Sequence, residues 1–190
     1  MNMFQIIMLG ISLYFAYQVY LHINTLQDPI KESKSRDRVS VIDPEYLVKK
    51  ADDAYERGDY KDALKYLKDA SAKDSQNRDI LNKLGFIFAK EAQFQEAVDV
   101  YKESLKLDDT DDTVHNAIAS VYRSLGEMDK AIEHYEKALS IDDRYAITYF
   151  NYGNLLVDMS QFDKAKEMYE RAIKIDPDFT QAKFELEKLK

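Results

Sequence analysis

The chain has 190 residues, of which 45% are hydrophobic and 33% charged, and it contains 5 Gly, 3 Pro and no Cys. This composition fits one folded domain of amphipathic helices, and the missing cysteines exclude a disulfide framework, a cysteine nucleophile and a thiolate metal site. The formal net charge of −8 argues against nucleic acid as a partner, because its phosphates need a basic surface.

The beginning of the chain has the character of a membrane span. Residues 1–27 contain no Asp, Glu, Lys or Arg, and the run from Phe4 to Ile23 is roughly 30 Å long as a helix, enough to cross a bilayer. A cleaved signal peptide is one alternative, but no basic residue precedes the run and no small-x-small site ends it. A buried helix of a soluble domain is the other. We expect residues 1–23 to form an uncleaved transmembrane anchor helix, with residues 4–23 in the membrane.

The residues after the run predict its orientation. Lys31, Lys34, Arg36 and Arg38 follow it, whereas the three residues before it carry no charged side chain. Basic residues stay on the cytoplasmic side, so we expect a single-pass membrane protein with its N-terminus outside and the remainder in the cytoplasm. Residues 24–43 mix charges with Ser and one Pro, without helical periodicity, and predict a linker.

From residue 44 onward the chain repeats itself. Alanine recurs every 34 residues, at Ala63, Ala97, Ala131 and Ala165. Twelve residues before each alanine stands a small residue, and four after it a large apolar one. The small set is Ala51, Gly85, Ala119 and Gly153, and the large set is Leu67, Tyr101, Tyr135 and Tyr169. Small residues let two helices approach closely, so this pattern predicts stacked helix pairs.

These residues resemble the tetratricopeptide repeat (TPR) family, whose unit is a helix–turn–helix of this length. The resemblance covers four units, at 44–77, 78–111, 112–145 and 146–179. It departs from the family where Ala92 and Ser160 replace the inter-helix Gly seen as Gly58 and Gly126. It implies an all-α, right-handed superhelix of four TPR units, here preceded by one N-terminal transmembrane helix. Residues 180–190 predict a short amphipathic capping helix over the last unit.

In the TPR family the first helix of each pair lines a concave groove, so the resemblance also implies the partner-binding residues. Asn can both donate to and accept from a partner's backbone, Phe forms apolar pockets, and Tyr and Arg are enriched at binding hot spots. The predicted groove residues are Tyr55, Asn82, Phe86, Lys90, Asn116, Arg123, Phe150 and Asn154. TPR domains that bind acidic chaperone tails carry Lys and Asn where this chain has Val48 and Asp52, which disfavours that partner.

The sequence offers no chemistry for catalysis. The three histidines, His22, His115 and His134, show no metal-ligand spacing; we expect His115 to be a packing residue and His134 to be exposed. Acidic pairs lie mostly at repeat junctions, where they suit helix N-termini, and no glycine-rich phosphate loop is present. We therefore predict no enzyme, no cofactor, no metal and no small-molecule substrate.

The features together predict a membrane-tethered protein–protein interaction module, a scaffold or assembly factor that binds a partner segment in the concave groove. The expected partner is a membrane-associated protein or peptide. The alternative is a structural accessory subunit of a larger membrane complex, held through its transmembrane helix. A third hypothesis is self-association through the convex or end faces.

Overall fold

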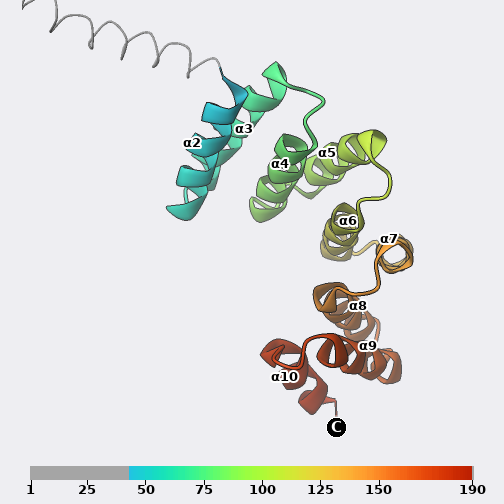
Figure 1. Ribbon diagram of the computed structural model, residues 1–190. Helices are drawn as coiled ribbons and strands as arrows, with labels where there is room; N and C mark the ends of the chain where they lie inside the picture. The colour runs from blue at the N-terminus through green and yellow to red at the C-terminus, as the bar shows by residue number, and fades with distance from the viewer. Residues whose placement is uncertain (1–42, 190) are drawn as a thin grey trace, which may run out of the picture.

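The structure, a computed structural model, describes residues 43–189. In this part of the chain all regular secondary structure is helical and there is no strand, which confirms the predicted all-α class (Figure 1). Its helices are α2 (Pro44–Glu56), α3 (Tyr60–Lys73), α4 (Arg78–Lys90), α5 (Phe94–Leu107), α6 (Asp112–Leu125), α7 (Met128–Ile141), α8 (Ala146–Asp158), α9 (Phe162–Ile175) and α10 (Thr180–Lys188).

The predicted transmembrane anchor, residues 1–23, and the linker up to residue 42 lie outside the described residues. Within residues 43–189, no helix combines the length and the apolar character that a membrane crossing requires.

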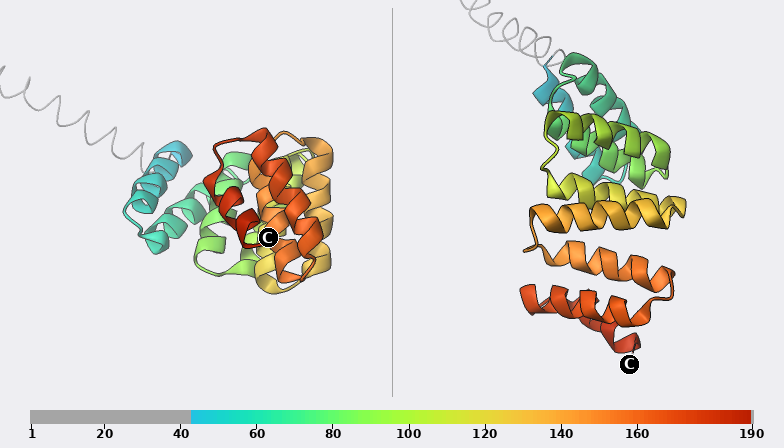
Figure 2. Two further views of the ribbon diagram at one scale, coloured as in Figure 1. Left: turned by 90° about the horizontal axis from the view of Figure 1, so that it is seen from below. Right: turned by 90° about the vertical axis from the view of Figure 1, so that its right-hand side faces the viewer.

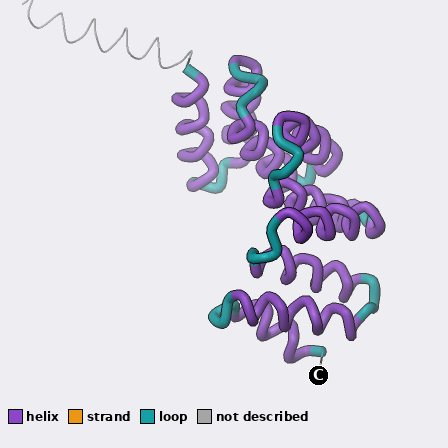
Figure 3. Tube along the Cα trace, turned by 45° about the vertical axis from the view of Figure 1, so that its right-hand side comes forward, coloured by secondary structure: helices purple, strands orange, loops and turns teal. Residues whose placement is uncertain are grey.

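Successive helices pair into antiparallel hairpins, and the hairpins stack one on the next. The tightest pairings are α2 with α3, α4 with α5, α6 with α7 and α8 with α9, and each second helix also packs against the first helix of the following pair. Figure 2 shows the resulting column of layered helices, and Figure 3 shows how short the connecting loops are. The predicted architecture of stacked helical repeats is confirmed.

Polar residues at the junctions start several of the helices. The side-chain oxygens of Asp43, Asp59, Asn77 and Asp111 each accept a hydrogen bond from a backbone N–H in the first turn of the next helix. This bond satisfies a donor that the helix itself cannot pair.

The turn inside each hairpin has the same backbone geometry whatever residue occupies it. Gly58, Ala92, Gly126 and Ser160 have φ values of 75°, 56°, 76° and 57°. This left-handed conformation is comfortable for glycine and strained for alanine and serine. Packing of the two helices of each hairpin therefore holds Ala92 and Ser160 in the left-handed conformation, although neither residue is the glycine that this turn usually contains.

The recurring alanines and the small residues before them lie where helices touch. Ala63, Ala97, Ala131 and Ala165 are all fully buried. At Gly85 an added Cβ would lie 2.7 Å from the Tyr101 ring, and at Gly153 it would lie 2.6 Å from the Tyr169 ring. Glycine at these positions thus lets a tyrosine ring lie directly against the helix backbone.

Helix α10 covers the exposed end of the last hairpin. Leu186 and Leu189 pack against the apolar cluster of Leu156, Ala165 and Tyr169. The opposite side of α10 stays in solvent, where Phe184 is 63% exposed and lies under the Lys188 ammonium. The helix has the two-faced character that a terminal cap requires.

Candidate partner-binding groove

The first helices of the four hairpins form the inner surface of the array. Besides their contacts within each hairpin, α4 contacts α6 and α6 contacts α8 directly, whereas the second helices pack chiefly on their own partner and on the next first helix. All eight residues predicted to bind a partner lie on α2, α4, α6 and α8. We refer to this surface as the groove.

Side chains from successive first helices meet across the groove at two fixed sequence separations. Partners 31 residues apart are Lys83 with Asp52, whose Nζ and Oδ1 lie 2.5 Å apart, and Phe86 with Tyr55, whose ring centroids lie 5.6 Å apart. Partners 35 residues apart are Asn151 with Asn116, at 3.2 Å between Nδ2 and Oδ1, and Arg123 with Asp158, at 2.5 Å between Nε and Oδ2. These contacts hold neighbouring repeats in register at the groove.

The three predicted asparagines use their oxygens inside the protein. Asn82 Oδ1 accepts a hydrogen bond from the Ser104 hydroxyl at 2.6 Å, and Asn154 Oδ1 accepts one from the Tyr169 hydroxyl at 2.7 Å. Asn116 Oδ1 accepts from Asn151. One of the two lone pairs of each amide oxygen is thus used inside the protein, and the second lone pair and the Nδ2 donors are what these side chains can offer to a partner.

A cavity of about 360 Å³ opens between α4 and α6, in the middle of the groove. Phe86, Lys90 and Asn116, three of the predicted residues, line it together. Its remaining walls are mostly apolar, from Ala89, Phe94, Tyr101, Ala117 and Val121, with hydroxyls from Ser120 and Ser124. Phe86 is 39% exposed, and the Lys90 ammonium lies 5.1 Å from the centre of its ring. The cavity thus combines an exposed aromatic surface with one positive charge.

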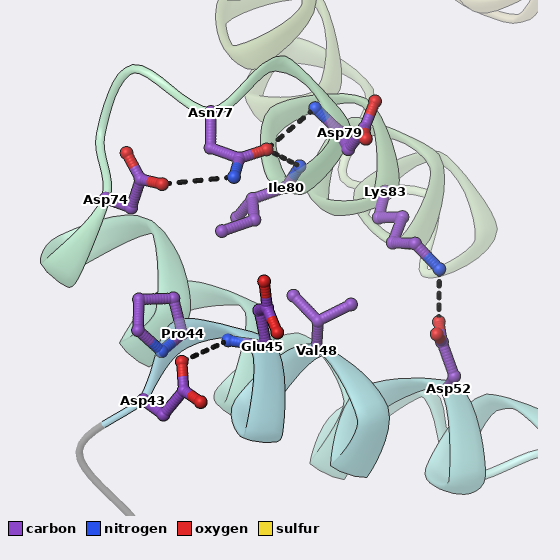
Figure 4. A pocket seen from close by; sticks show the side chains of 10 residues that line it. All are labelled: Asp43, Pro44, Glu45, Val48, Asp52, Asp74, Asn77, Asp79, Ile80 and Lys83. Atoms are coloured by element: carbon purple, nitrogen blue, oxygen red, sulfur yellow. Dashed lines mark hydrogen bonds and ion pairs between the residues drawn. The ribbon is translucent and has the colours of Figure 1, made fainter. Parts of the chain in front are cut away.

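Nearer the N-terminus, a second cavity of about 530 Å³ lies between α2 and α4 and is strongly acidic. Its carboxylates are Asp43, Glu45, Asp52, Asp74 and Asp79. Figure 4 shows Lys83, the only basic side chain in its lining, paired with Asp52, and Asn77 bridging from Asp74 to the first turn of α4. Since Lys83 pairs with Asp52, the other four carboxylates have no cationic partner within this lining.

At the C-terminal end the groove is more apolar. Ile147 at the start of α8 is 47% exposed, whereas Phe150, predicted to bind a partner, is partly buried. The Phe150 ring lies 5.0 Å from the Phe179 ring and 5.9 Å from the Tyr169 ring, centre to centre. The structure therefore gives Phe150 a packing role beneath the groove and leaves Ile147 as the exposed apolar side chain.

Sequence reasoning missed the partners of the predicted residues. Lys83 and Asn151 occupy the same step of their repeats and each reaches back to the preceding first helix. Arg123, predicted as a hot spot, has its guanidinium paired with Asp158. The sequence does hold complementary residues 31 or 35 positions apart. The repeat period is 34, however, and it does not show that side chains of neighbouring first helices meet at these other separations.

The titratable groups beneath the groove are held in their neutral forms. Burial raises the pKa of Tyr135 and of Tyr169 to about 12, so both hydroxyls keep their protons and remain hydrogen-bonded, to Ser120 and Asn154 respectively. In the described part of the chain no group of three or more His, Asp and Glu side chains is arranged to hold a metal ion.

The sequence matches one known protein family. A family model described as tetratricopeptide repeat matches residues 76–142 and 109–178, which together span more than half of the chain. No curated protein matches the chain.

Several solved structures share the fold. The MamA protein is 25% identical, with 77% of this chain and 80% of that chain covered and a TM-score of 0.66. The first TPR of Spaghetti (RPAP3), solved with the HSP90 peptide SRMEEVD, is 25% identical over 60% of this chain and 91% of that chain, with a TM-score of 0.57. YrrB, described as a TPR protein with an unusual peptide-binding site, is 19% identical, with 82% and 85% covered and a TM-score of 0.65.

Proposed function

This chain belongs to the tetratricopeptide repeat family and is a protein–protein interaction module, and we propose that its groove binds an extended segment of a membrane-associated partner. The observation that carries the proposal is the central cavity, where Phe86, Lys90 and Asn116 share one opening on the inner surface. An exposed aromatic ring in a concave site is a common anchor point for a partner side chain.

The chemistry of the groove defines the segment it accepts. The central cavity suits an apolar side chain, and the ammonium of Lys90 at its edge suits a neighbouring carboxylate. The Nδ2 groups of Asn82, Asn116 and Asn154 supply donors for the backbone carbonyls of an extended chain. The acidic cavity between α2 and α4 favours a basic residue towards that end of the segment.

An acidic chaperone tail does not meet these requirements. Spaghetti binds such a peptide, SRMEEVD, and shares the fold of this chain. Here Val48 and Asp52 line the acidic cavity. Lys83 offsets the charge of Asp52, but the carboxylates of Asp43, Glu45, Asp74 and Asp79 line the same cavity. A tail rich in carboxylates would be repelled at this end.

Tethering to a membrane completes the proposal. Residues 4–23 have the length and composition of a span, and the basic residues after them favour a cytoplasmic groove. A tether confines the groove to one membrane face and thereby raises its effective concentration towards partners in the same membrane. A scaffold or assembly factor for a membrane complex would use such an arrangement.

Photo-crosslinking in intact membranes tests the proposal. A photoreactive phenylalanine analogue placed at Phe86 should give an adduct with one partner, whereas the same analogue at Phe184 should not. Phe184 is the matched control because it is also an exposed phenylalanine but lies on α10, outside the lining of the central cavity. The absence of an adduct at Phe86, or equal adducts at both positions, would contradict the proposal.

The same crosslinking experiment distinguishes the two hypotheses, a tethered interaction module and an accessory subunit held by its transmembrane helix. Replacing residues 4–23 with an unrelated apolar helix should leave the Phe86 adduct intact if the groove selects the partner. Loss of the adduct in that variant, with the protein still in the membrane, would favour the subunit.

A further inference from the structure

Two histidines that are far apart in the sequence meet on the outer side of the third repeat. His115 lies on α6 and His134 on α7, and their Nδ1 atoms are 3.0 Å apart. The ring centroids are 5.1 Å apart, with an angle of 37° between the ring planes. Neither residue belongs to the groove described above.

The hydrogen bonds around the pair determine which ring nitrogen carries a proton. The backbone carbonyl of Asp109 can only accept, so His115 Nε2–H donates to it, at 3.3 Å. A neutral His115 therefore presents a lone pair on Nδ1, and His134 Nδ1–H donates to that lone pair. The bond to Asp109 also fixes the orientation of the His115 ring, as the outer hydrogen bond of a metal-bound histidine does.

His115 is buried, with 7% of its surface exposed, whereas His134 is partly exposed. Both rings line an open cavity of about 480 Å³, together with Glu133, Glu136 and Lys137. A neutral imidazole is the form that binds a metal ion.

We propose that His115 and His134 form a binding site for one divalent transition-metal ion of the Ni²⁺, Cu²⁺ and Zn²⁺ class, held between their two Nδ1 atoms. With metal–nitrogen distances of about 2.0–2.1 Å, a separation of 3.0 Å between the nitrogens corresponds to an angle of about 90° at the ion. That angle fits neighbouring positions of an octahedral or square-planar ion, the geometry that Ni²⁺ and Cu²⁺ prefer.

Binding needs no net loss of a proton. The proton on His134 Nδ1 moves to Nε2 of the same ring through water, and the Nδ1 lone pair then faces the ion. Because no third protein ligand is arranged around the described pair, water fills the other positions, and Glu133 in the same cavity offers a nearby negative charge. The affinity is accordingly lower than at a structural site with four protein ligands.

A bound ion would connect α6 to α7 and so stabilise the third repeat. Metal binding should therefore be detectable as a rise in Tm. The full chain, without a polyhistidine tag and in detergent micelles, is titrated with NiCl₂, and binding is measured by equilibrium dialysis and by the Tm from circular dichroism. We expect one ion per chain and a rise in Tm. His115→Gln and His134→Gln should each weaken binding at least tenfold and abolish the rise in Tm.

His22→Gln is the matched control, since it removes the remaining histidine of the chain and leaves the pair intact. It should bind Ni²⁺ as the original protein does, and MgCl₂ should not raise the Tm of either. Absence of binding by the original protein would overturn the proposal. So would unchanged binding by either His115→Gln or His134→Gln with a native circular dichroism spectrum, or loss of binding in His22→Gln.

Discussion

An alanine at Gly153 would place its Cβ 2.6 Å from the nearest ring carbon of Tyr169. No real Cβ contact is that short, so the ring or the helix must move. The first repeat shows the alternative solution, because there Ala51 occupies the small position and Leu67 the large one. Glycine stands opposite tyrosine in the second and fourth repeats and alanine opposite leucine in the first, whereas the third repeat accommodates Ala119 with Tyr135, both fully buried. The fit at Gly153 therefore depends on how closely the Tyr169 ring lies against it.

This matching predicts a coupled effect. Gly153→Ala should lower the free energy of unfolding by about 1–3 kcal/mol through overpacking. In a Tyr169→Leu background the same change should cost less, because the smaller side chain leaves room for the Cβ. Urea denaturation followed by circular dichroism measures both steps, and equal costs in the two backgrounds would contradict the prediction.

The histidine pair predicts a dependence of stability on pH in metal-free buffer. The pKa of His134 is lowered to about 4 in the folded chain, against an ordinary value near 6.5, so the unfolded chain takes up the proton first as the pH falls. The contribution is fully present above pH 6.5 and is lost between pH 6.5 and pH 4. Between pH 7 and pH 5 the original protein should lose more stability than His134→Gln, and the difference should be smaller than the full pKa shift implies because solvent screens the half-buried ring. Parallel pH profiles in urea denaturation would rule this out.

At the scale of the elements, α10 is the cap of the stack, and its two faces should respond differently to substitution. Leu186 is partly buried against the cluster of Leu156 and Tyr169, so Leu186→Asp places a charge on this apolar contact and should cost about 2 kcal/mol. Phe184→Ala removes a side chain that is 63% exposed and should cost little. Thermal unfolding compares the two variants, and a Phe184→Ala effect as large as that of Leu186→Asp would show that the assignment of the faces is wrong.

The helices and their pairing were predictable because one period of small and large residues runs through the whole array. Ala63 and its equivalents are fully buried, as close helix packing requires. The contacts across the groove were not predictable to the same degree, since the period does not say whether neighbouring first helices meet 31, 34 or 35 residues apart. The hydrogen bond between Asn116 and Asn151 depends on this offset. Asn82 and Asn154 instead pair with Ser104 and Tyr169 of the second helix in their own hairpins, contacts that need the side-chain geometry of the hairpin and not only its period.

The meeting of His115 and His134 was hidden for a similar reason. Their separation of 19 residues crosses a turn, and only the hairpin geometry brings α6 and α7 together at that point. Two histidines on one helix bind the same metal ion when they are about four residues apart, and a separation of 19 residues does not match that pattern. His134, expected to be exposed, is instead half-buried against its partner.

At the scale of the whole molecule, the stack is a row of units that contact only their neighbours, so its ends should open before its middle. Helix α2 packs mainly against α3, and no preceding repeat covers it in the described chain, whereas α4 to α7 have neighbours on both sides. Hydrogen exchange followed by mass spectrometry should therefore show faster exchange in α2 and α3 than in α4 to α7. Uniform protection along the array would indicate a single cooperative unit instead.

The four hairpin turns share one left-handed geometry although glycine occupies only two of them. A segment cut at one such turn and joined at the next begins and ends in the same backbone conformation, so duplication of a 34-residue block leaves both junctions unchanged. The inner surface can thus lengthen by whole units, in evolution or by design, without any new loop having to be invented.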